Sequence, residues 1–111
     1  MIRAKFYTKN DSIHMSLKGH AGAAPIGEDL ICAGATMMAY TVAQAVQFMQ
    51  DFGKLKKRPK ISLNEGNADI VVTPREKDYA EALHTFYVAQ CGIHLLAHNY
   101  PEHVKLEHLT V

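Results

Sequence analysis

Apolar and polar residues alternate in two segments near the start of the chain. Residues 2–8 and 13–17 each place apolar side chains at every second position, and the turn-forming residues 9–12 separate them. This period of two is typical of strands with one buried face, and Asn and Asp favour the turns of hairpins. We therefore predict a β-hairpin whose second strand ends at Gly19 and His20.

Residues 30–52 show a different pattern, since they contain no turn signal and are apolar almost all round. This pattern is typical of a long, largely buried helix. Asp29 is of the residue type that accepts hydrogen bonds from first-turn amides, and Gly53 is of the type that ends helices. The sequence predicts a helix over 30–52 with Asp29 as its N-cap and Cys32 in its first turn.

The remaining sequence predicts a second hairpin, a second helix and a last strand. Two short strand-like segments, 61–63 and 68–73, flank a turn at 65–67. Helical spacing follows over 79–98 and ends before a proline, after which residues 104–111 are strand-like. We expect a single α+β domain over 1–111, with a mainly antiparallel sheet packed with two helices in the order ββαββαβ.

Composition narrows the class of protein. The 111 residues are 48% apolar, which suits one modest core, and 12 basic residues nearly balance 11 acidic ones. A net charge of +1 gives no global attraction to nucleic acid or to a membrane, and we expect neither as a partner. The chain shows no signal-peptide zones and no apolar run near about 18 residues. We expect a cytoplasmic protein with two free thiols, Cys32 and Cys91.

The stretch 19–34, GHAGAAPIGEDLICAG, is the best candidate for an active site. A cysteine attacks only as its thiolate, and both a helix N-terminus and a protonated imidazole favour that anion. His20 and Cys32, twelve positions apart, are placed to form such a pair. The alternative is a structural pair, a buried Cys32 and a strand-end His20, because free cysteine is among the most buried residue types.

Small residues around this pair suggest further parts of a site. The backbone amides of Ala33 and Gly34 are candidates to hold a developing oxyanion at the start of the helix. Gly22 and Gly27 leave room for a substrate backbone and offer hinges for the loop between the histidine and the cysteine. We therefore expect the loop 21–28 to be disordered without substrate.

The string GHA at 19–21, the acidic Asp29 and LICAG at 30–34 together resemble the ribosomal-processing cysteine protease (Prp) family. The likeness covers nearly the whole chain, including the helix rich in Ala and Met after the cysteine. The resemblance implies a cytosolic bacterial endopeptidase, without a cofactor, that removes the N-terminal extension of a large-subunit ribosomal protein. It also implies a homodimer.

The resemblance assigns roles to individual residues. His20 is the base and acid, and Cys32 is the nucleophile. Asp29 matches the family's acidic position and either orients the histidine or caps the helix. Thr36 stands one helical turn after Cys32, where serine is usual in the family, so a hydroxyl is kept. The non-enzymatic alternative is a ribosome-associated or peptide-binding module on the same fold.

Two other groups of residues suggest binding sites. Cys91, His94 and His98 share one helix face, as metal ligands do, but no fourth ligand is near in sequence. We therefore expect core or interface histidines and no metal. The basic run 54–60 has no interleaved aromatic residues to stack on bases, so we interpret it as a solvated connector.

Overall fold

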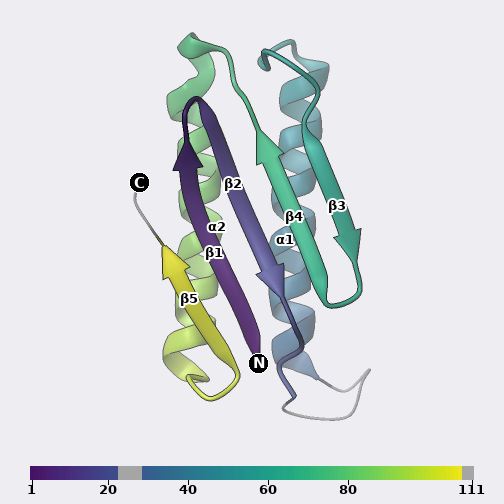
Figure 1. The fold of residues 1–111 in the computed structure, drawn as a ribbon, viewed down its shortest axis with the longest axis vertical. Coiled ribbons are helices and arrows are strands. Elements are labelled where there is room, and N and C mark those ends of the chain that lie inside the picture. The colour runs from purple at the N-terminus through teal and green to yellow at the C-terminus, as the bar shows by residue number, and fades with distance from the viewer. Residues whose placement is uncertain (23–28, 109–111) are drawn as a thin grey trace.

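Five strands form one sheet, and two helices lie side by side over one of its faces (Figure 1). The computed structural model describes residues 1–22 and 29–108. In chain order the elements are β1 (Ile2–Lys9), β2 (Ser12–Lys18), α1 (Leu30–Asp51), β3 (Lys60–Asn64), β4 (Asn67–Val72), a short 3-10 helix η1 (Glu76–Asp78), α2 (Tyr79–Asn99) and β5 (Val104–His108). The predicted order ββαββαβ and the α+β class are confirmed.

The sheet has the strand order β3-β4-β2-β1-β5 and is mostly antiparallel. The two predicted hairpins form its antiparallel core, with Ala4 opposite Leu17 in the first and Leu63 opposite Ala68 in the second. β5 instead pairs in parallel with β1, and Ile2 lies opposite Val104. Because α2 carries the chain back along the sheet after β4, β5 enters it in the direction of β1.

Alternation in the strands determines which side chains enter the core. Ile2, Ala4 and Phe6 are buried beneath the helices, whereas Arg3 and Lys5 between them are exposed. On α1 the buried positions recur with helical spacing, and they are Ile31, Ala35, Ala39, Val42, Ala43, Val46 and Met49. On α2 they are Ala82, Phe86, Ala89 and Ile93. Each helix therefore buries one stripe against the sheet and its neighbour.

The prediction that the first helix is largely buried was wrong. Phe52 is 73% exposed at its C-cap, and Met37, Tyr40 and Phe48 are also more than half exposed. The two helices form a single layer, so none of the residues in 1–22 and 29–108 covers the side of α1 that faces away from the sheet. By length and mean hydropathy α1 could also span a membrane, a test that core helices of soluble proteins pass as well.

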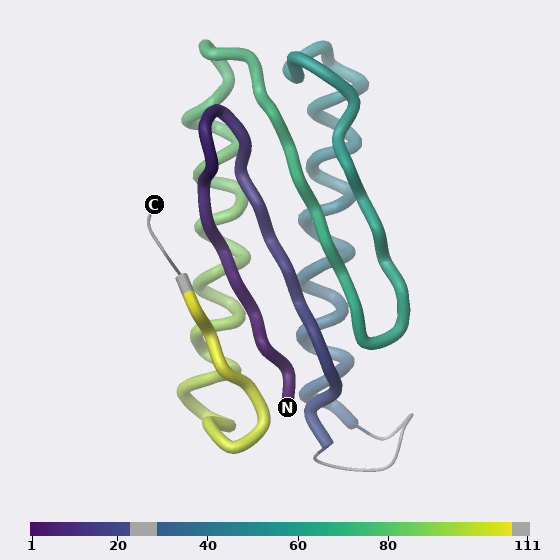
Figure 2. The backbone as a smooth tube through the Cα atoms, viewed as in Figure 1, coloured from purple at the N-terminus to yellow at the C-terminus, as the bar shows by residue number. Residues whose placement is uncertain are grey.

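The connections bring three segments to one end of the molecule. The end of β2, the first turn of α1 and the β3–β4 turn all lie near the N-terminus in Figure 2. Lys18, the last residue of β2, pairs with Asn67 at the start of β4. A turn around residue 66 is therefore held beside the histidine that follows β2.

Candidate active site

Cys32 lies in the first turn of α1, as predicted, because Asp29 starts the helix there. The Asp29 carboxylate accepts a hydrogen bond of 2.9 Å from the Cys32 amide. The main-chain carbonyl of Asp29 accepts one of 3.0 Å from the Ala33 amide. Asp29 is thus the predicted N-cap. The Cys32 side chain is partly buried and forms no disulfide. It is an accessible thiol at the positive end of a helix.

His20 follows β2 and is exposed. Gly19 before it adopts φ +92°, and a Cβ at this position would lie 2.3 Å from the Met1 carbonyl oxygen. Only glycine fits there, because both the backbone angle and the close approach exclude a side chain. The Gly19 amide donates a 2.9 Å hydrogen bond to the Gly66 carbonyl, which joins the end of β2 to the β3–β4 turn.

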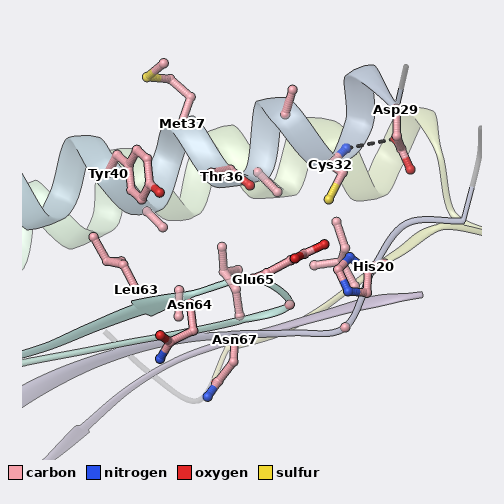
Figure 3. Close-up of a pocket in the computed structure, with 18 of the residues that line it drawn as sticks. His20, Asp29, Cys32, Thr36, Met37, Tyr40, Leu63, Asn64, Glu65 and Asn67 are labelled. Atoms are coloured by element: carbon pink, nitrogen blue, oxygen red, sulfur yellow. Dashed lines mark hydrogen bonds between the residues drawn. The ribbon is translucent and has the colours of Figure 1, made fainter. Parts of the chain in front are cut away.

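His20 and Cys32 line one cavity of about 710 Å³. Figure 3 shows the Cys32 sulfur directed from α1 into this space, towards the segment that carries His20. α1 also contributes Thr36 and Tyr40, and the β3–β4 turn contributes Glu65 on the opposite wall. Among the described residues no hydrogen bond joins the thiol to the imidazole. The structure thus brings the predicted pair to one cavity.

Sequence reasoning missed the close contact between Gly66 and the imidazole. Gly66 has φ +72°, and a Cβ there would lie 2.8 Å from His20 Nε2. The turn at 65–67 is visible in the sequence, but no local signal places it against His20. The contact arises from long-range pairing of β2 with β4.

The predicted oxyanion donors do not suit that role in this structure. The Ala33 amide already donates to the Asp29 carbonyl. Gly34 lies one position further into α1, where each amide donates to the carbonyl four residues earlier. Both amides are therefore occupied within the helix.

Two of the three remaining predicted site residues lie within the described part of the chain. Thr36 lines the cavity one turn after Cys32, and Gly22 also lines it, with φ +69°. Gly27 lies outside the described residues, and so does most of the loop 21–28 whose disorder we expected. Thr36 and Gly22 thus lie at the predicted site.

Asp29 caps the helix, and this role predicts how its variants behave. Asp29→Ala is expected to lower the free energy of unfolding by about 1 kcal/mol, whereas Asp29→Asn should stay near wild type, because asparagine caps as well as aspartate. Urea unfolding followed by circular dichroism measures both. Equal losses in the two variants would contradict the capping role.

The other two candidate sites gain no support. Among the described residues no group of three His, Cys, Asp or Glu side chains is placed to hold a metal ion. Cys91, His94 and His98 are all exposed on α2. In the basic run, Lys54 pairs with Glu81 at 2.8 Å and Lys56 with Asp11 at 3.0 Å. These exposed ion pairs agree with a solvated connector.

The chain matches a known protein family. A family model described as cysteine protease Prp matches residues 1–105. A search of curated proteins gives no match.

Solved structures share the fold over nearly the whole chain. The essential ribosomal processing protease Prp of Staphylococcus aureus, with a covalently linked product peptide, matches with a TM-score of 0.73 and 19% identity. The match covers 98% of this chain and 100% of that one. SMU.848 from Streptococcus mutans matches with a TM-score of 0.70 and 23% identity, over 100% and 96% of the two chains. The S. aureus protease with a substrate peptide gives a TM-score of 0.69 and 17% identity, over 98% and 100%. At these identities the structures show a shared fold.

Proposed function

Because the chain belongs to the cysteine protease Prp family, we propose that it is an endopeptidase with a catalytic dyad of Cys32 and His20. The observation that carries this proposal is that both side chains line one cavity of about 710 Å³. One comes from a helix N-terminus and the other from a strand end. A nucleophile and a base that face one space are the minimum for covalent peptide hydrolysis.

The proposed reaction proceeds in two stages. His20 takes the proton of Cys32, and the thiolate attacks the carbonyl carbon of the scissile bond. The imidazolium then gives that proton to the leaving amine as the C–N bond breaks, which leaves a thioester on Cys32. Water, deprotonated by the same imidazole, attacks the thioester; the C–S bond breaks, the thiol regains its proton from the imidazolium, and the product leaves as a carboxylic acid that ionises in solvent.

We further propose that the substrate is the N-terminal extension of a large-subunit ribosomal protein. Family membership supports this, and the S. aureus Prp structures described above contain a substrate peptide and a product peptide. The cavity extends from the dyad along α1 to Tyr40, with Leu63 and Ala39 in its walls. A channel of this form suits an extended peptide with apolar side chains.

Cleavage of a synthetic peptide tests the proposal. Wild-type protein should cut a peptide that spans the extension and the mature N-terminus at one bond, which mass spectrometry identifies. Cys32→Ala should give no product, whereas Cys91→Ala, which removes an exposed free thiol elsewhere, should cut normally. Binding of the peptide without cleavage by wild-type protein would establish the non-catalytic module instead.

We also propose that the protein acts as a cytoplasmic homodimer through the outer side of its helices. Large exposed apolar side chains lie on both, namely Leu30, Met37, Phe48, Tyr87, Val88 and Leu95. Exposed apolar surface of this kind marks interaction sites, and two free cysteines suit a reducing compartment. Light scattering should give twice the mass of the chain, and a monomer at micromolar concentration would contradict the dimer.

A further inference from the structure

A second histidine contacts the segment that carries His20. His103 lies between α2 and β5, and its Nδ1 is 2.8 Å from the Ala21 carbonyl oxygen. The two residues are 82 positions apart. Ala21 directly follows His20, so this hydrogen bond acts on the backbone beside the proposed base.

The direction of this hydrogen bond follows from its partners. A carbonyl oxygen only accepts, so the proton must be on Nδ1 of His103. Both the imidazolium and the neutral tautomer with a proton on Nδ1 satisfy this. The interaction therefore persists whether or not His103 is charged.

Main-chain bonds hold His103 on both sides. Its amide donates to the Tyr100 carbonyl at 2.9 Å, and its carbonyl accepts from the Ile2 amide at 2.8 Å. The second of these bonds joins the start of β5 to the start of β1. The imidazole thus extends from a fixed point of the backbone, and its partner Ala21 is only 3% exposed.

The residues on either side of His20 are both anchored. Gly19 is bound to Gly66 through a backbone hydrogen bond of 2.9 Å, and Ala21 is bound to the His103 ring. Gly22 is the last residue that the structure describes before Asp29. In the described part of this segment, His103 therefore holds the buried residue that directly follows His20.

We propose that His103 is a positioning residue, which fixes the backbone at Ala21 and so directs His20 towards Cys32. This inference rests on the proposed function for its catalytic consequence. The positioning itself is independent of which substrate the protein cuts. A small displacement of a catalytic group lowers the rate steeply, by up to about a hundredfold for 1 Å.

Two substitutions separate the hydrogen bond from the bulk of the ring. His103→Ala removes the donor, whereas His103→Asn places an amide nitrogen at the same number of bonds from Cα as Nδ1. For peptide cleavage, His103→Ala should lower kcat by about ten- to a hundredfold with KM changed less than twofold. His103→Asn should restore most of kcat. His98→Ala, which removes an exposed histidine of α2, is the matched control and should leave both constants unchanged.

Two further measurements test the inference independently of protease activity. Hydrogen exchange at residues 19–22 should become faster in His103→Ala and remain slow in His103→Asn. Alkylation of Cys32 by iodoacetamide at pH 6.5, in a Cys91→Ala background, should slow in His103→Ala alone. Thermal unfolding shows whether each variant is folded at the assay temperature.

The outcomes distinguish the two proposals. Unchanged exchange at 19–22 and unchanged alkylation in folded His103→Ala would overturn the positioning role. Equal loss of kcat in the alanine and asparagine variants would also overturn it. If wild-type protein cuts no peptide but exchange and alkylation change as expected, the protease assignment fails and the positioning role stands.

Discussion

Replacing His20 with alanine is expected to lower kcat for peptide cleavage by about 10²- to 10⁴-fold, the usual contribution of a positioned general acid and base. The proposed imidazole acts three times, since it takes the thiol proton, protonates the leaving amine and deprotonates the water that attacks the thioester. Loss of His20 therefore removes three contributions at one position.

Steady-state kinetics with the extension peptide measures this effect. The alkylation rate of Cys32 at pH 6.5 should fall in parallel, because the variant has no imidazole to accept the thiol proton. His94→Ala removes an exposed histidine on α2 and should change neither rate. If the His20→Ala variant were alkylated and cleaved the peptide at the same rates as wild-type protein, His20 would be excluded as the base.

Gly66→Ala is expected to lower kcat by at least about tenfold while the protein remains folded. An added Cβ would lie 2.8 Å from His20 Nε2, so the imidazole must move away. Because His20 is exposed, it can rotate outwards with little loss of packing. The displaced ring then no longer faces the cavity that Cys32 lines, and misplacement of this kind lowers the rate steeply.

Gly53→Ala is a matched control for this substitution. Gly53 ends α1 with φ +72°, the same backbone angle as Gly66, but a Cβ there has no atom within 4 Å. Both alanines should lower the free energy of unfolding by about 1 kcal/mol, because both residues occupy the left-handed region. Only Gly66→Ala should lower kcat. An equal loss of kcat in both variants would attribute the effect to stability and contradict the contact with His20.

Local patterns predicted most of the fold because its elements are regular. The first hairpin follows from strict alternation, and α1 follows from its apolar run between Asp29 and Gly53. The pair of His20 and Cys32 could also be predicted from a short stretch of sequence, since only twelve positions separate them. The capping role of Asp29 was one of two open possibilities, and the hydrogen bond to the Cys32 amide shows that it caps the helix.

Long-range contacts explain what the sequence did not reveal. Gly66 reaches His20 because β4 pairs with β2, and His103 reaches Ala21 because β5 pairs with β1. No local period encodes either pairing. The exposed side of α1 was missed for a related reason, because a run that is apolar all round does not show which side the sheet covers. The amides of Ala33 and Gly34 do not suit the predicted role of oxyanion donors, because both already donate hydrogen bonds within the helix.

The parallel pairing of β5 with β1 also determines when the site can form during synthesis of the chain. His20 and Cys32 leave the ribosome early, but β1 gains its second neighbour only when residues 104–108 have been translated. The ring that holds Ala21 is at position 103, so it also arrives late. A nascent chain therefore carries both reactive side chains well before it can hold them in place. Translation of residues 103–108, rather than translation of the two reactive residues, is the step that assembles this site.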